Sequence, residues 1–281
     1  AEILAMRRLA VDARDRKLIA RALARQARYK IETDLGTGVE RDVDAAVRAA
    51  RRTGEARTEA EARRVLAVHL GKSGRYADAL LAIDEALGAL ETRAALAPPP
   101  GGGADEGVRA ARTVRVESLL TKGALLRQTG EIQRAIEVYA EAYAVLQRHG
   151  PRRLLAHVLN ALGVACHSRG DYADALRLYL GSIAVHRESG QRDKLGLALS
   201  NAGQCYAALG LDERALVLLR KAVDVFGALG ARGSGSSEAH AALAEMHAAR
   251  GEGALALAEL ERARPRDRGL AGHGHGRRAL C

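Results

Sequence analysis

Two short segments contain residues that could do chemistry. Gly71-Lys72-Ser73 resembles the end of a phosphate-binding loop, in which backbone N–H groups and a lysine hold phosphate oxygens. That loop also needs a glycine at position 66 and a preceding strand, but Leu66 lies there within a helical pattern. The Gly-rich run PPPGGG lacks GxGxxG spacing and is better interpreted as a linker. We therefore expect no nucleotide site.

Metal ligation is the second possibility. His273, His275 and Cys281 could bind zinc, but the set lacks the fourth ligand of a stable site. Cys166 and Cys205 fall at similar places in successive helical patterns and could approach each other, although small core thiols are the better interpretation. The sequence predicts no metal and no other cofactor.

Catalytic constellations are not apparent. No Ser-His-Asp set, Cys-His pair, pair of carboxylates or HExxH motif lies in a recognisable context. In a repeat protein such residues could still converge from several units, so an enzyme with a convergent site is one hypothesis. The prediction is that the chain is not an enzyme.

Composition favours a helical protein. The chain has 281 residues, of which 48% are hydrophobic, 28% charged and 3% aromatic. Few aromatic residues and much Ala, Leu, Arg and Glu argue for helices and against a β-sandwich or barrel. Three cysteines without a CxxC pair indicate a reducing compartment, so we expect a cytoplasmic location. The absence of any run of 18 uncharged apolar residues predicts no membrane span.

Five segments repeat in phase and must position any functional side chain. They read GRYADAL, GEIQRAI, GDYADAL, GLDERAL and GEGALAL, with glycines at 74, 130, 170, 210 and 251. An apolar-periodic stretch precedes and follows each glycine, which predicts a helix, a tight turn and a second helix. Neither helix can bury its apolar face alone, so neighbouring units must stack.

Small residues recur at fixed distances from the turn glycine, where two helix backbones are expected to approach closely. They are Gly123, Gly163 and Gly203 before the turn, Ala79, Ala135, Ala175, Ala215 and Ala256 five residues after it, and Ala86, Ala142, Ser182, Ala222 and Ala263 twelve residues after it.

This pattern resembles the tetratricopeptide repeat, on Gly163, Gly170, Tyr172, Ala175 and Tyr179 and their counterparts in the other units. The period of about 40 is similar to the longer variety of bacterial signalling and regulatory proteins. The resemblance implies an all-α, right-handed superhelical solenoid of antiparallel helix pairs.

The expected organisation has five parts. Residues 1–54 form a degenerate repeat and a half, 55–97 a repeat, 98–110 a Pro/Gly-rich loop, 111–264 four repeats and 265–281 a disordered basic tail. Residues 1–14 look like a second helix without its first helix, and no polar capping helix is evident at the other end, which suggests a fragment of a longer protein.

The resemblance also implies a concave groove lined by the first helices. Asn160, Asn201 and Gln204 could hydrogen-bond a peptide backbone there. The full expected set is Arg64, Lys72, Thr121, Arg127, Gln128, His157, Asn160, His167, Ser200, Asn201 and Gln204, with Glu245 as its acidic member. These positions do not reproduce the Lys/Asn/Arg clamp of chaperone-binding members.

Two function classes compete with the enzyme. The first is a non-enzymatic protein-interaction scaffold that holds a peptide or partner domain in this groove, as a regulatory part of a larger bacterial signalling protein. The second is a nucleic-acid-binding repeat protein, because the formal net charge is +10. Residues 1–64 and 262–281 each carry +5, and residues 65–261 are neutral, so the charge favours the scaffold. The oligomeric state is left open.

Overall fold

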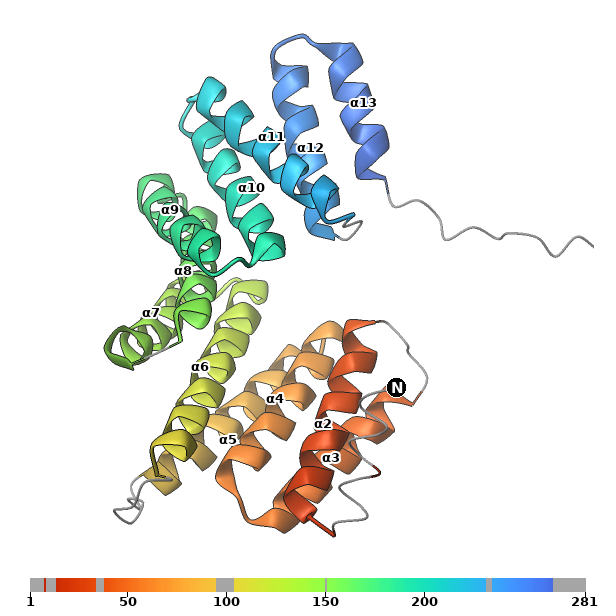
Figure 1. Ribbon diagram of the computed structural model, residues 1–281, viewed down its shortest axis with the longest axis vertical. Coiled ribbons are helices and arrows are strands. Elements are labelled where there is room, and N and C mark those ends of the chain that lie inside the picture. The colour runs from red at the N-terminus through yellow and green to blue at the C-terminus, as the bar shows by residue number, and fades with distance from the viewer. Residues whose placement is uncertain are drawn as a thin grey trace, which may run out of the picture. The chain divides into compact units, whose positions relative to one another are not determined.

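The computed structural model describes residue 8 and residues 14–33, 38–94, 104–149, 151–230 and 234–264. Within these ranges every regular element is an α-helix, which confirms the predicted all-α class (Figure 1). The helices are α2 (Arg16–Glu32), α3 (Val39–Thr53), α4 (Ala56–Lys72), α5 (Tyr76–Ala94), α6 (Ala104–Gln128), α7 (Ile132–His149), α8 (Arg152–Arg169), α9 (Tyr172–Glu188), α10 (Arg192–Ala208), α11 (Asp212–Ala228), α12 (Ser234–Ala249) and α13 (Gly253–Ala263).

The turn between the two helices of a pair has the predicted glycine in the left-handed region. At Gly170 φ is 92°, and the four counterparts have φ between 71° and 85°. The next residue closes the turn, since Asp171 N–H donates to the Cys166 carbonyl at 3.0 Å. This hydrogen bond satisfies a carbonyl that the end of α8 would otherwise leave open.

The chain divides into two compact units, Ala1–Leu178 and Tyr179–Cys281, and the division falls inside α9. In the first unit α2 packs on α3, α4 on α5 and α6 on α7. In the second, α10 packs on α11 and α12 on α13. Each of these pairs is a first helix followed by a second helix, as the sequence predicts.

The first helices also contact one another. α2 contacts α4, α4 contacts α6 and α6 contacts α8, while α10 contacts α12 in the second unit. No second helix contacts another second helix in the part of the chain that the structure describes. Within each unit, successive helix pairs are therefore joined through contacts between their first helices.

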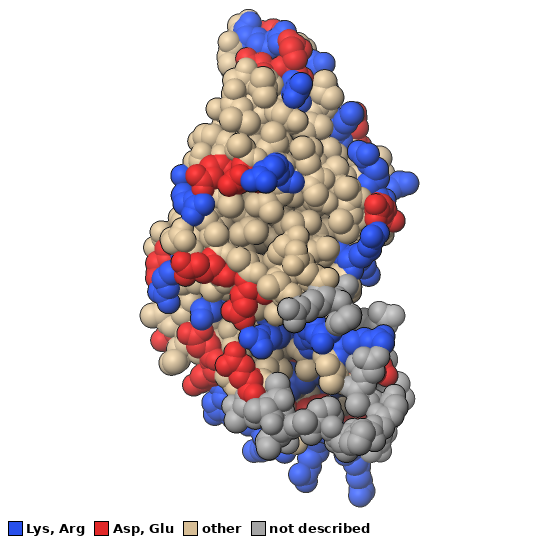
Figure 2. All heavy atoms as spheres, turned by 90° about the vertical axis from the view of Figure 1, so that its left-hand side faces the viewer, with Lys and Arg blue, Asp and Glu red and all other residues tan. Residues whose placement is uncertain are grey.

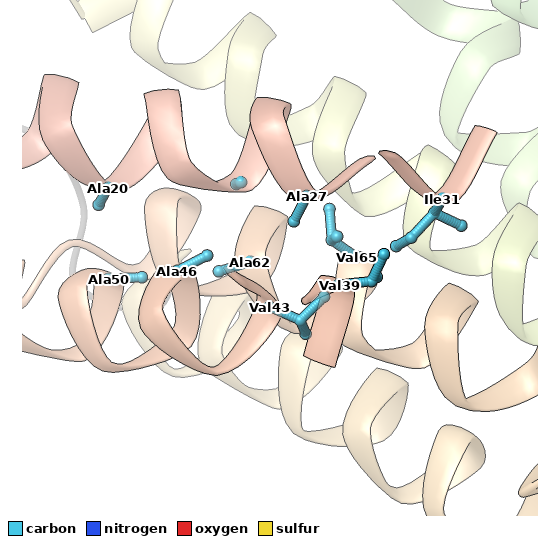
Figure 3. Packing of buried hydrophobic residues seen from close by; sticks show 10 residues of the cluster. Ala20, Ala27, Ile31, Val39, Val43, Ala46, Ala50, Ala62 and Val65 are labelled. Carbon is cyan, nitrogen blue, oxygen red and sulfur yellow. The ribbon is translucent and has the colours of Figure 1, made fainter. Parts of the chain in front are cut away.

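Alanines form much of the core where helices cross. Figure 3 shows Ala20 and Ala27 of α2 facing Ala46 and Ala50 of α3, with Ala62 of α4 beside them. Side chains this small let the helix backbones approach closely. The small-residue positions predicted around the turns are buried likewise, from Ala79 to Ala222, and Ala256 is 6% exposed.

The ends and the insertion need separate mention. α6 begins at Ala104, inside the 98–110 segment expected to be a loop. Residues 265–281, predicted as a disordered tail, lie outside the described residues. The same holds for all but two of residues 1–14, predicted as a second helix.

Candidate functional site

An ion pair joins two first helices of the first unit. Arg64 of α4 lies 2.9 Å from Glu117 of α6, with Arg64 Nη2 and Glu117 Oε2 as the closest atoms. The Arg64 side chain is 14% exposed, and its buried Nε has no hydrogen-bond partner among the described residues. Burial lowers the pKa of the Arg64 guanidinium, and Glu117 opposes this effect. A charged group of a ligand could bind here only by replacing part of the contact between Arg64 and Glu117.

Further charges surround this pair. On α4, Arg57 contacts Glu61 at 3.2 Å, and both side chains are about a quarter exposed. On α2, Arg28 contacts Glu32 at 2.7 Å. Arg28, Glu32 and Glu61 all act electrostatically on Arg64. The described first helices α2, α4 and α6 thus carry charged groups of both signs around Arg64.

Two of the predicted groove residues donate hydrogen bonds to backbone carbonyls. Lys72 Nζ donates to the Ile31 carbonyl at 2.7 Å and so ties the end of α4 to the end of α2. Thr121 Oγ1 donates to the Glu117 carbonyl at 3.0 Å, within α6. The GKS segment therefore ends a helix, where Lys72 contacts a backbone carbonyl.

The remaining predicted residues of the first unit lie on α6 and α8. Burial raises the pKa of the Tyr139 hydroxyl to about 12, and Arg127, which hydrogen-bonds it, acts in the opposite direction. Gln128 and His157 are exposed, and Asn160 is half-buried. His167 packs edge-on against Tyr172, with 5.2 Å between the ring centroids, and burial lowers its pKa.

Three predicted residues lie on α10 of the second unit. Ser200 is 2% exposed, and Gln204 Nε2 donates to its hydroxyl at 3.4 Å. Asn201 is half-buried, while Glu245 on α12 is exposed. The eleven predicted residues are thus divided, with eight on α4, α6 and α8 and three on α10.

Other candidate chemistry can also be located. Both described cysteines, Cys166 and Cys205, are buried, as expected for core thiols, and burial raises the pKa of Cys166. The described residues contain no group of three or more His, Cys, Asp or Glu side chains that could hold a metal ion. His273, His275 and Cys281 lie outside these residues, as does PPPGGG.

Sequence reasoning missed Glu61 and Glu117 as charged neighbours of Arg64. Glu61 carries a local signal, because it precedes Arg64 by three residues and so shares its side of the helix. Glu117 carries no such signal, since its pairing with Arg64 depends on how α6 aligns with α4.

Charge is mixed on the described surface. Figure 2 shows acidic and basic side chains in small groups beside one another, with uncharged surface between them. Even basic α2 is partly neutralised, because Arg21 contacts Glu55 at 3.4 Å and Lys30 contacts Asp42 at 2.6 Å. No helix in the described ranges is long and apolar enough to cross a membrane.

The comparisons with known proteins agree with the repeat pattern. Residues 115–188 and 154–228 match the family model described as tetratricopeptide repeat. No curated protein matches the sequence significantly.

Solved structures resemble the fold over most of its length. BtubC (BKLC) from P. vanneervenii has a TM-score of 0.67 at 19% identity, covering 85% of this chain and 94% of that one. Rap protein complexed with Competence and Sporulation Factor has a TM-score of 0.65 at 12% identity, covering 88% of this chain and 64% of the Rap chain. A putative kinesin light chain from Podospora anserina has a TM-score of 0.54 at 16% identity, covering 72% and 91%. These structures share the tetratricopeptide-like solenoid fold, which is typical of protein-interaction scaffolds.

Proposed function

Because residues 115–228 match the tetratricopeptide repeat family and the fold is a tetratricopeptide-like solenoid, we propose that the chain is a non-enzymatic scaffold that binds a peptide or partner domain on its first-helix face. The observation that carries the proposal is that, within each unit, each first helix contacts the next first helix, whereas no second helix contacts another second helix in the described residues. We infer from this that the first helices line a concave face. The concave face is where repeat proteins of this kind bind their partners.

The side chains on this face suit a polypeptide ligand. Asn160 of α8 has an amide that can donate to and accept from a peptide group, and Gln204 offers the same chemistry on α10. The mixed charges around Arg64 and Glu117 suit a ligand that carries both signs. Such a face would select a ligand by the pattern of its charges and by hydrogen bonds to its backbone.

We also propose a regulatory role in a bacterial signalling protein and a cytoplasmic location. The repeat period of about 40 supports the first. The Rap structure is an example of this fold in complex with a factor, Competence and Sporulation Factor. The buried thiols of Cys166 and Cys205 support a reducing compartment.

The test uses peptides selected from a displayed random library against the whole chain. Binding of the selected peptides is measured by fluorescence polarisation. The triple variant Asn160→Ala, Asn201→Ala, Gln204→Ala should weaken binding by about tenfold or more, which equals ~1.4 kcal/mol. Single variants would assign each peptide to the first or the second unit.

The matched control is Gln133→Ala, which removes an exposed amide from a second helix. It should leave peptide affinity unchanged, and circular dichroism should show equal helix content in all variants. Peptides that bind the triple variant as tightly as the parent chain would contradict the groove assignment.

A further inference from the structure

Arg64 places a charge where the other repeats have none. It lies three residues before Ala67, the small residue of its first helix. The corresponding residues of the other four units are uncharged, namely Leu120, Asn160, Ser200 and Ala241. The helices that carry them form the same repeat fold, so the fold does not require an arginine at this position.

The two members of the Arg64–Glu117 pair are enclosed unequally. The Arg64 side chain is 14% exposed, whereas that of Glu117 is 33% exposed. An ion that is held away from water without a partner is costly, and the cost grows with its burial. Arg64 therefore needs a partner at all times, while Glu117 can release Arg64 and be hydrated. A ligand that enters here can replace the carboxylate of the pair but not the guanidinium.

Arg64 also has unused hydrogen-bond donors. A guanidinium carries five N–H groups, and a carboxylate can bind two of them at once. Glu117 contacts Arg64 through Nη2 at 2.9 Å, and Nε lacks a hydrogen-bond partner among the described residues. The contact with Glu117 thus leaves part of the donor capacity of Arg64 available to another carboxylate.

The neighbouring carboxylates are already compensated. Glu61 contacts Arg57 at 3.2 Å on α4, and Glu32 contacts Arg28 at 2.7 Å on α2. Both acidic groups act electrostatically on Arg64, but each has a guanidinium of its own beside it. The repulsion that they exert on an incoming anion is reduced accordingly. The main competitor of an incoming carboxylate is therefore the partner that Arg64 already has.

We propose that Glu117 holds the place of a ligand carboxylate. In the bound state an Asp or Glu side chain of the peptide pairs with Arg64, and Glu117 turns toward water. This inference rests on the proposed binding of a peptide by the first helices. It adds that the first unit selects an acidic residue and masks its own site when the site is empty.

The exchange predicts that variants of the two residues change affinity in opposite directions. The probes are peptides selected from the displayed library whose binding Asn160→Ala weakens, which assigns them to the first unit. In fluorescence polarisation with the whole chain, Arg64→Gln should weaken their binding by about tenfold or more. Glu117→Gln removes the internal competitor and should strengthen their binding by about three- to tenfold. Peptides resynthesised with Asn for Asp and Gln for Glu should bind weakly, and neither variant should change their affinity.

Glu91→Gln is the matched control. Glu91 is an exposed carboxylate on α5, 3.3 Å from Arg115, so its replacement changes the net charge as Glu117→Gln does. Because Glu91 lies on a second helix, this variant should bind the peptides like the parent chain. Circular dichroism should show equal helix content in all variants.

Two results would overturn the inference. One is weaker binding in Glu117→Gln, because the ligand would then supply a cation to Glu117. The other is unchanged binding of the acidic peptides in either variant, which would make the pair a purely structural contact. The proposed groove fails separately, if the triple variant of Asn160, Asn201 and Gln204 leaves peptide binding unchanged.

Discussion

The ring of Tyr139 on α7 lies directly against the backbone of Gly123 on α6. A Cβ atom at Gly123 would be 2.6 Å from Cζ of Tyr139 and 2.8 Å from Cδ1. Such distances are far inside van der Waals contact, so the Tyr139 ring or the two helices must shift to admit a methyl group. Because Gly123 has no side chain, α6 and α7 can cross this closely.

Gly123→Ala should therefore destabilise the chain, by about 1–3 kcal/mol, as overpacking of a helix crossing does. The control is Gly88→Ala on α5, where nothing lies within 4 Å of the new methyl. That variant should stabilise the helix by about 0.5–1 kcal/mol, since alanine favours helix over glycine. Urea denaturation gives both values, and a stabilising Gly123→Ala would show that Tyr139 can move aside.

The Arg64–Glu117 pair should be worth more than a surface ion pair. Glu117→Ala leaves the mostly buried Arg64 guanidinium without its closest carboxylate. We expect the free energy of unfolding to fall by about 1–3 kcal/mol. Arg64→Met with Glu117→Ala should recover part of this loss, because no buried charge then remains. The double-mutant cycle measures the coupling, and a coupling near zero would contradict a structural role for the pair.

The sequence predicted more of the fold than of the candidate binding face. Repeat phase predicted the turns, since Gly170 and its counterparts recur at a period of about 40 and lie in the left-handed region. It also predicted that polar side chains such as Asn160 lie on the first helices. It could not predict that Arg64 meets Glu117, because this contact depends on the offset between α4 and α6. It also could not predict that Lys72 reaches the Ile31 carbonyl, because a long side chain has several partners within range.

Lys72→Met tests that second contact. The ammonium group satisfies a carbonyl at the end of α2, where the helix dipole is negative, so its loss should cost about 1 kcal/mol. Lys72→Arg should retain much of the stability. If Lys72→Met instead leaves the thermal midpoint unchanged and weakens peptide binding, Lys72 acts on a ligand.

Stability should decrease in mild acid through His186. This side chain is 2% exposed, its Nδ1 lies 2.9 Å from Gln191 Oε1, and burial lowers its pKa. Asp193 opposes this effect and Lys194 adds to it. Because the unfolded chain binds the proton more readily, the stability is fully present above about pH 6.5 and is lost as the pH falls below it.

His186→Asn keeps a side-chain N–H near Gln191 and cannot titrate. The parent chain should lose more stability than this variant between pH 7 and pH 5, as measured by urea midpoints across the range. Parallel pH profiles for the two proteins would show that protonation of His186 does not oppose folding.

The contact pattern of the helices has a consequence for local opening. Each described helix touches elements no more than two places along the series, so no long-range contact ties distant hairpins together. Disturbance of one hairpin then spreads only to its neighbours. Amide hydrogen exchange should accordingly vary from hairpin to hairpin, and it should be faster in α2–α3, whose described contacts lie on one side, than in α4–α5, which contacts both α2–α3 and α6.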